Sequence, residues 1–371
     1  MKAIKIGFTE YHGATKEIVP NPPKGVSFTV LKPTGNPPAC IKSPIKGYLR
    51  RYDSLDCDLI ETHLSPIITK NKWIYYTACF QESAAFSFYS LPLPIQIRSA
   101  FLKFLMTRQN FKKLIFWSNA GLKTLRNYGK LSSDIIDAKT TVVYPAIRHA
   151  PDDLLHKPNK NNRFNILFSG AFFIKGGVNV IDAFERVLKL YPDTTLTLCC
   201  DEKIDFFALN AALKGKYLKK IKDNTNILCM GRVPRERLLT DILPNADVYL
   251  LPSYQEAFGF SILEAMAWGV PIIASNIFAI PEMIEDHING ILIDILSFNP
   301  AKIFPGSIVN TIPDDFRDHV TDSLYVAIIE LIESPSLAGK LSADGLRIVR
   351  TKFSFQERNA KMLKIYSNAM L

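Results

Sequence analysis

The feature that most constrains the fold is an alternation of short apolar runs with helical patterns, which occurs once in each half of the chain. Near-continuous apolar runs of this length are typical of strands in a parallel sheet that is covered on both faces. In the first half these runs lie at 3–9, 59–63, 73–76, 114–117 and 141–144. A polar, turn-rich segment at 151–163 follows them and indicates a linker.

After the linker the alternation begins again, which predicts a second parallel sheet. Strands are expected at 165–168, 195–198, 226–229 and 248–251, and helices near 178–190 and over 234–243. The 371 residues are enough for two domains of ordinary size. We therefore predict an α/β protein in which two Rossmann-like domains, 1–150 and 164–352, face a cleft and are joined by the linker.

The net charge of +10 lies entirely in the first half, because residues 1–150 contain 21 Lys and Arg against 9 Asp and Glu. A basic domain attracts anionic lipid headgroups, nucleic acid or a phosphorylated substrate, or is simply a solvated surface. No nucleic-acid-binding motif accompanies the charge, so nucleic acid is not an expected partner. The segment 95–111 carries apolar Ile97, Phe101 and Leu105 beside three basic residues. It predicts a helix that covers the sheet with a solvated face rather than a membrane anchor.

Two features bear on the compartment and on metals. No apolar stretch is long enough to span a membrane, so a cytoplasmic protein is expected, with a peripheral position at the inner membrane face as a candidate. The six cysteines form no Cys-x-x-Cys pair and have no histidines at metal spacing. They are interpreted as buried free thiols, and neither a metal site nor a resident cofactor is predicted.

The most informative stretch begins where a predicted strand ends at Leu251. A tight loop containing Gly259 follows, and the next helical pattern ends at Gly269 before Pro271. Such a strand–loop–helix unit places unpaired backbone N–H groups and the positive helix end at the carboxyl edge of a sheet, which suits a diphosphate. Gly259 is expected to let the backbone approach the phosphate.

Two carboxylates flank this loop. Glu256 lies in the loop and Glu264 lies in the first turns of the helix, so they point to different parts of a bound ligand. A carboxylate accepts hydrogen bonds from sugar hydroxyls, which makes Glu264 a candidate for a ribose and Glu256 one for a transferred sugar. For Glu264 a capping box begun by Ser261 remains an alternative.

The stretch resembles the signature of glycosyltransferase family 4, a retaining group with the GT-B fold. The shared residues, in the family's order, are Pro252-Ser253, the Glu-x7-Glu pair, Phe258-Gly259, Glu264-Ala265-Met266-Ala267, Gly269-Val270-Pro271, Pro281-Glu282 and Asn289-Gly290. The resemblance implies that residues 353–371 form a closing helix that crosses back to the first domain. It also implies that Ala257, Phe258, Gly259 and Phe260 join Glu256 and Glu264 in binding the donor.

A second match to the family lies at 168–176, where Gly170 and Lys175 stand in the loop after the first strand of the second domain. A lysine there can neutralise the diphosphate leaving group, which makes Lys175 a predicted catalytic residue. Glu256, the candidate for binding the transferred sugar, is the other. The family's usual arginine after the first glycine is replaced by Ala171, which leaves three candidates for neutralising the phosphate: Lys175 alone, Arg232 after Gly231, or a basic residue of the first domain. The segment 226–233 resembles the part that flanks the nucleotide base, which makes Arg232 and Val233 donor-binding candidates.

The first domain departs further from the family, since its first loop has one glycine and 76–82 contains no histidine. His12 and His63 are its candidates for the acceptor side. The expected activity is transfer of a hexose from a UDP-, GDP- or ADP-sugar, without a metal ion, to a sugar, glycan or lipid-linked acceptor. Alternatives are an epimerase or phosphorylase on the same fold, or a non-catalytic sugar-nucleotide binder. A nicotinamide enzyme is disfavoured, because no Gly-x-Gly-x-x-Gly follows a predicted strand.

Overall fold

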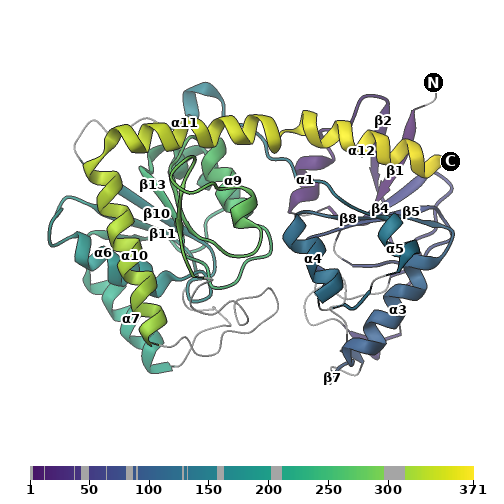
Figure 1. The fold of residues 1–371 in the computed structure, drawn as a ribbon, viewed down its shortest axis with the longest axis horizontal. Helices are drawn as coiled ribbons and strands as arrows, with labels where there is room; N and C mark the ends of the chain where they lie inside the picture. Colours follow the sequence, from purple (N-terminus) through teal and green to yellow (C-terminus); the bar gives the residue numbers. More distant parts are fainter. Residues whose placement is uncertain are drawn as a thin grey trace. The chain divides into compact units, whose positions relative to one another are not determined.

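The computed structural model divides into two compact units, residues 1–147 with 352–371 and residues 148–351 (Figure 1). The structure describes residues 3–11, 13–36, 38–42, 50–63, 65–80, 87–88, 91–127, 129–131, 133–156, 163–201, 211–295 and 314–371. Part of the predicted linker, 157–162, lies outside the described residues. No described helix is long and apolar enough to cross a membrane.

The first unit is built on a six-stranded sheet in the order β2-β1-β4-β5-β8-β9, and every strand pair in it is parallel. The strands are β1 (Ile4–Phe8), β2 (Val26–Val30), β4 (Leu59–Thr62), β5 (Trp73–Thr77), β8 (Phe111–Phe116) and β9 (Thr140–Val142). The predicted parallel sheet is therefore confirmed. A small antiparallel sheet of β3 (Ile41–Lys42), β6 (Ser87–Phe88) and β7 (Leu91–Pro92) accompanies it.

Alternating side chains of the strands feed two separate cores, one on each face of the sheet. Trp73 and Tyr75 of β5 join the core beneath α3 (Ile95–Thr107), α4 (Asn119–Asn127) and α5 (Asp134–Ala138). Ile74 and Tyr76 join the core beneath α1 (Ala14–Ile18) and α12 (Phe355–Met370). Figure 1 shows α12 on one side of this sheet and α3 on the other. The C-terminal helix thus supplies one wall of the first unit's core.

Two details of the predicted helix 95–111 are wrong. The helix ends at Thr107, because Arg108 is extended and Phe111 already starts β8. Its buried residues are Leu102, Leu105 and Met106, whereas Ile97 is exposed. The face of the helix that packs on the sheet is therefore rotated about the helix axis, by about one residue, from the apolar face that the sequence suggested.

The second unit has a parallel sheet in the order β12-β11-β10-β13-β14-β15. Its strands are β10 (Asn165–Ser169), β11 (Thr195–Cys199), β12 (Ile227–Cys229), β13 (Val248–Leu251), β14 (Ile272–Ser275) and β15 (Ile291–Ile293). Its longer helices are α6 (Gly177–Val187), α7 (Ala211–Asp223), α9 (Phe260–Ala267), α10 (Asp314–Glu333) and α11 (Pro335–Lys352). The second predicted parallel sheet is confirmed.

Two expectations for the second unit need correction. The helix expected over 234–243 is a single turn, α8 (Arg235–Arg237), followed by a π-helical turn at Leu238–Ile242 and a 3-10 turn at Leu243–Asn245. The thiols are not all buried, because Cys229 is exposed and Cys40 is half-buried. Cys229 lies in β12, the edge strand of the sheet, which pairs with β11 alone.

Candidate functional site

The second sheet contains a topological switch point between β10 and β13. From β10 the chain moves outward through β11 to β12, whereas from β13 it moves in the opposite direction through β14 to β15. Ligands of such sheets bind outside the carboxyl ends of the strands at the switch point. The two segments singled out in the sequence, 168–176 and 252–264, follow these two strands. The topology therefore brings both predicted segments to the position where a ligand is expected.

The two loops are held together by their backbones. Gly176 has a left-handed φ of 80°, and a Cβ atom there would lie 2.2 Å from the carbonyl oxygen of Pro252. The N–H of Tyr254 donates to the carbonyl of Ile174 at 3.0 Å. Both the dihedral angle and the close approach require glycine at position 176. The loop after β10 is thereby fixed against the loop after β13.

Lys175 and Glu256, the predicted catalytic residues, form an ion pair across these loops. Lys175 Nζ lies 2.7 Å from Glu256 Oε2 and also donates to the carbonyl of Gln255 at 2.8 Å. The other carboxylate oxygen, Glu256 Oε1, accepts the N–H groups of Ala257 at 2.9 Å and Phe258 at 3.4 Å. A cation, a carboxylate and two backbone donors thus converge at the switch point.

This arrangement corrects one expectation about the loop. The sequence predicted that the N–H groups ahead of the helix are unpaired, but those of Ala257 and Phe258 are hydrogen-bonded to the carboxylate of Glu256. The side chain of Phe258 is buried, whereas Ala257 and Phe260 are half-buried. Further along, the N–H groups of Ile262 and Leu263 donate to the carbonyl of Gly259 at 3.0 and 3.4 Å. The positive end of the helix dipole at the start of α9 is the remaining candidate for binding an anion.

Two glycines of the site are explained by their surroundings. Gly259 is the N-cap of α9 with φ 101°, and a Cβ atom there would lie 3.0 Å from Met283 Cε. The left-handed backbone and the packing on Met283 both favour glycine at this position, and the close approach to a phosphate stays a prediction. Gly170 has φ 123°, and a Cβ atom there would lie 3.3 Å from Lys175 Cγ. Gly170 leaves the space in which the stem of Lys175 lies.

Glu264 has a partner that sequence reasoning missed. Its Oε1 accepts a hydrogen bond from Arg235 Nε at 2.5 Å. The capping-box alternative is wrong, because the helix is capped two residues before Ser261, at Gly259, without a side-chain hydrogen bond. The predicted donor residues Arg232 and Val233 lie in the turn before α8, where Arg232 is exposed and Val233 half-buried. Arg235 is the first residue of α8, and nothing in the sequence links it to Glu264.

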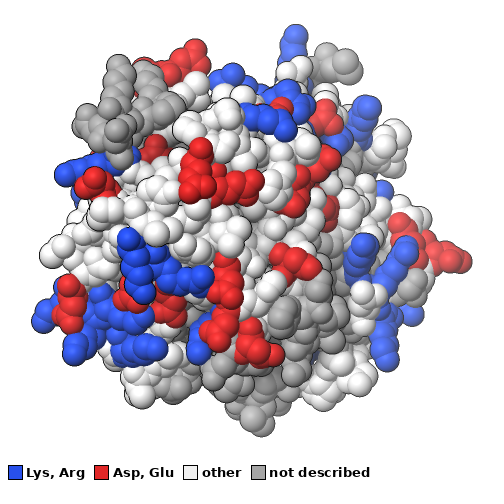
Figure 2. All heavy atoms as spheres, turned by 60° about the vertical axis from the view of Figure 1, so that its left-hand side comes forward, with Lys and Arg blue, Asp and Glu red and all other residues white. Residues whose placement is uncertain are grey.

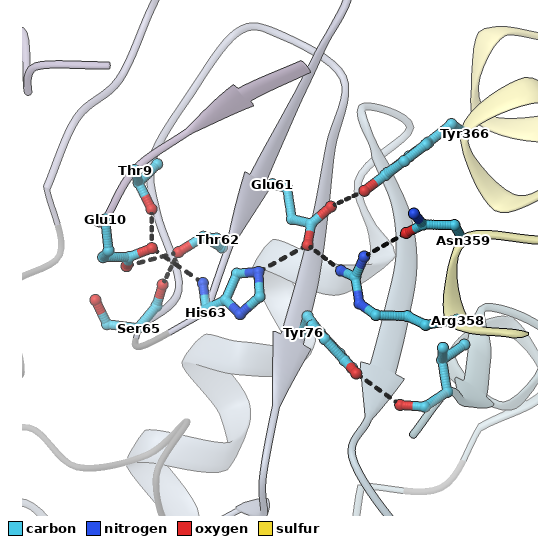
Figure 3. A network of polar contacts seen from close by, with 11 residues as sticks. Thr9, Glu10, Glu61, Thr62, His63, Ser65, Tyr76, Arg358, Asn359 and Tyr366 are labelled. Carbon is cyan, nitrogen blue, oxygen red and sulfur yellow. Dashed lines mark hydrogen bonds and ion pairs between the residues drawn. The ribbon is translucent and has the colours of Figure 1, made fainter. Parts of the chain in front are cut away.

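The first sheet has its own switch point, between β1 and β4, and Figure 3 shows the polar side chains there. Glu10, directly after β1, accepts hydrogen bonds from Thr9 Oγ1 at 2.5 Å, Thr62 Oγ1 at 3.2 Å and the N–H of His63 at 3.1 Å. Glu10 is half-buried and was not predicted. The available signal was a polar residue at the carboxyl end of the first strand. His12 lies outside the described residues.

His63 is described, and it is buried. Its Nε2 lies 2.7 Å from Glu61 Oε1, and its ring packs between Phe8 and Tyr76. Its Nδ1 is buried without a hydrogen-bond partner among the described residues. Figure 3 shows the His63 ring turned toward Glu61. In this structure the candidate acceptor histidine is thus part of an internal polar network.

The network continues from Glu61 to the C-terminal helix. Arg358 Nη2 lies 3.5 Å from Glu61 Oε1, and the Tyr366 hydroxyl donates to Glu61 Oε2 at 2.5 Å. Burial alone would raise the pKa of Glu61, but the hydrogen bond and charge of His63, the charge of Arg358 and the hydrogen bond from Tyr366 hold it below its usual value. The same carboxylate contributes to a raised pKa of the Arg358 guanidinium. A buried ion pair thereby joins α12 to β4.

Comparison with known proteins identifies the fold of this chain. Residues 163–301 match the family model described as glycosyl transferases group 1. Two solved structures match nearly the whole chain: a glycosyltransferase from Rickettsia africae (TM-score 0.63, 15% identity, 100% of this chain and 99% of that one) and Anabaena HepE in complex with UDP and glucose (TM-score 0.61, 16% identity, 98% and 99%). The fold is GT-B.

Sequence relatives agree with the family match but cover less of the chain. Glycogen synthase of Mycobacterium tuberculosis is 29% identical over 155 residues, which are 42% of this chain and 36% of that protein. The chain covers less than half the length of the first curated relatives that it matches. Together these similarities show the GT-B fold for the chain and a likeness of residues 163–301 to group 1 glycosyl transferases. Among the described residues, no group of three or more His, Cys, Asp and Glu is placed to hold a metal ion.

Proposed function

We propose that this protein is a retaining hexosyltransferase that uses a nucleoside diphosphate sugar as donor and needs neither a metal ion nor a cofactor. The observation that carries the proposal is the Lys175–Glu256 pair, which lies at the switch point of the domain that matches group 1 glycosyltransferases. Anabaena HepE, a structural neighbour, is complexed with UDP and glucose. A UDP-, GDP- or ADP-sugar in the second unit is the corresponding proposal for this chain.

In the proposed reaction the bond from the anomeric carbon to the diphosphate breaks, and a new bond forms from that carbon to an acceptor oxygen. The proton of the acceptor hydroxyl leaves for the departing phosphate. Negative charge develops on the diphosphate, where Lys175 and the N-terminal turn of α9 stabilise it. Glu256 accepts hydrogen bonds from the hydroxyls of the transferred hexose.

The second acidic residue, Glu264, is proposed to bind another part of the donor. Glu264 is proposed to accept hydrogen bonds from the ribose, and Arg235 Nε, 2.5 Å away, orients its carboxylate. Glu264 lies in α9, beyond the loop that contains Glu256, so the two carboxylates are suited to the two sugars of one donor. Gly170, Arg232, Val233 and the 257–260 backbone complete the proposed donor set.

The acceptor is proposed to bind at the switch point of the first unit, where Glu10 is held by three hydrogen bonds. A fixed, half-buried carboxylate is a suitable acceptor for sugar hydroxyls. The basic excess of residues 1–150 favours an anionic or lipid-linked acceptor. A cytoplasmic protein in peripheral contact with an anionic membrane is the corresponding proposal for its location.

The test compares two ion pairs of the second unit. In both pairs Nζ lies 2.7 Å from a carboxylate oxygen, and the exposed fractions of the side chains are 21% and 11% for Lys175–Glu256 against 24% and 23% for Lys220–Asp182. Thermal-shift measurements with UDP-, GDP- and ADP-sugars first identify the donor. Sugar release and transfer are then measured for Lys175→Met and Lys220→Met.

Loss of Lys175 is expected to lower kcat by about 10²–10³, as for other residues that stabilise developing negative charge, whereas Lys220→Met leaves kcat unchanged. The stereochemistry of the product, read by NMR, tests retention. Full turnover in Lys175→Met would refute the assignment. Donor binding without any turnover in the natural protein would show a sugar-nucleotide binder instead.

A further inference from the structure

The outward face of α3 is apolar at its centre and basic at its flanks. Ile97 and Phe104 are 52% and 57% exposed, although both are large apolar residues. They are seven positions apart and so lie on the same side of the helix. Lys103 and Arg108, on either side of them, are also exposed. The opposite side of α3 buries Leu102, Leu105 and Met106, so this helix is already seated on the sheet.

The segment that contains α3 is basic, and the acidic residues nearest to it, Asp134 and Asp137, lie in α5, which packs against α3. Residues 83–133 contain eight Lys and Arg and no Asp or Glu. The second unit differs, and Figure 2 shows basic and acidic side chains interspersed on the side that it brings forward. There Lys220 pairs with Asp182 and Glu185, and Arg186 pairs with Asp322. Of the eight cations near α3, Arg126 pairs with Asp137 of α5, and the others leave this region with an excess of positive charge.

A basic depression adjoins this face at the amino-terminal ends of β5 and β8. Its volume is about 520 Å³, and its lining includes Lys70, Lys72, Arg108 and Lys112 together with Leu371. Lys72 Nζ donates to the carbonyl of Met370 at 2.5 Å, so the most accessible of these cations are the others. Arg108 belongs to both features, because its guanidinium lies 5.4 Å from the centre of the Phe104 ring. The depression and the exposed apolar side chains are thus parts of one continuous surface.

We propose that this continuous surface binds the headgroup region of an anionic phospholipid membrane. The α3 surface is defined as Ile97, Lys103, Phe104 and Arg108 with Lys70, Lys72 and Lys112. Large apolar side chains framed by Lys and Arg match the membrane interface, where apolar groups enter the acyl boundary and cations contact phosphates. A nucleic acid would use the cations but leave Ile97 and Phe104 exposed.

The α3 surface would supply the membrane contact of the proposed function. The inference rests on the proposed function in one respect, namely that the contact gives access to a lipid-linked acceptor. Binding itself requires neither donor nor turnover. Membrane binding and sugar transfer are consequently measured separately. Transfer to a soluble acceptor without membrane binding overturns the α3 surface alone, and membrane binding without donor turnover overturns the enzymatic proposal alone.

The experiment is flotation of the full chain with vesicles. Vesicles of phosphatidylglycerol mixed with phosphatidylcholine are expected to bind the protein at low salt, and pure phosphatidylcholine vesicles are not. Removing the basic side chains in Lys70→Gln/Arg108→Gln/Lys112→Gln is expected to weaken binding by about a hundredfold, at about fivefold for each charge. Phe104→Ser is expected to weaken it by about tenfold through lost insertion.

Matched controls come from the second unit. Leu190 is 58% exposed, close to Phe104, so Leu190→Ser removes a comparable apolar side chain. Lys216→Gln/Lys219→Gln/Lys222→Gln removes the same total charge from exposed positions of α7. Both controls should bind vesicles like the natural protein, and thermal unfolding should show all variants folded.

Three results would overturn the proposal. The first is the absence of binding to anionic vesicles at low salt, and the second is equal loss of binding in the α3-surface variants and their controls. The third is binding to nucleic acid that is tighter than binding to anionic vesicles. In that case the α3-surface variants would abolish nucleic-acid binding, and vesicles would not compete for it.

Discussion

Replacing Glu61 by Gln tests the buried network of the first unit most directly. Gln keeps the size of the side chain but removes the charge, and Arg358 is then left buried without its carboxylate partner. Breaking a buried ion pair from one side costs about 3–5 kcal/mol. Each kcal/mol shifts the midpoint by about 2–4 °C in a unit of this size, so the Tm of the first unit should fall by about 6–20 °C.

Calorimetry of three variants separates this cost from a general effect of substitution. Arg358→Met added to Glu61→Gln removes the orphaned charge, and it should recover at least half of the lost Tm. Glu357→Gln breaks the exposed Lys361–Glu357 pair on the same helix and should cost about 0.5 kcal/mol or less. If Glu61→Gln and Glu357→Gln lower the Tm equally, the reasoning about buried charge is refuted.

The pH dependence of the same effect follows from the lowered pKa of Glu61. A carboxyl whose pKa is lower in the folded state stabilises the protein above its unfolded pKa, near 4.5, and this contribution is lost as the pH falls through the folded pKa. The Tm difference between the natural protein and Glu61→Gln should therefore be full at pH 7 and shrink below about pH 4.5. A difference that grows on acidification would contradict the direction of the shift.

Three further outcomes are expected in the second unit. Gly176→Ala should lower the Tm, since the left-handed backbone alone costs about 1–2 kcal/mol and the facing loop leaves no room for Cβ. Arg235→Gln should raise the KM for the donor by about tenfold with a smaller change in kcat, because it releases Glu264 without removing a charge-stabilising group. A thiol reagent at pH 8 should modify the exposed Cys229 first and spare Cys199, since burial raises the pKa of that thiol to about 11.

The sheets were predictable because their signals are local. Apolar runs and the turns between them give strand positions within a few residues, and the alternation with helices makes the strands parallel. The segment from Leu251 to Gly269 was also predictable, since glycines mark the beginning and the end of α9 in the sequence. The relation of these segments to the switch point followed once the strand order was known.

The errors arose where tertiary contacts decide the outcome. Cys229 is exposed because β12 is an edge strand, and strand order is not a local property. Ile97 is exposed because α3 packs on the sheet through a face that is rotated by about one residue from the apolar face predicted from the sequence. The partners Arg235 of Glu264 and Arg358 of Glu61 are distant in sequence, so no spacing rule indicates them. Side-chain pairs of this kind are determined by the folded arrangement.

Each unit fixes a carboxylate beside its switch point, but after a different strand of the pair and by different means: Glu10 follows β1, and Glu256 follows β13. In the second unit Glu256 accepts N–H groups of its own loop, and in the first unit Glu10 accepts the N–H of His63 from the neighbouring strand end. In both cases the carboxylate is fixed at the carboxyl edge beside the switch point, where a ligand meets parallel strands. Only Glu256 was visible in the sequence, because glycines and the Glu-x7-Glu spacing surround it. Glu10 has no such surroundings, and its position becomes meaningful only because β4 lies beside β1.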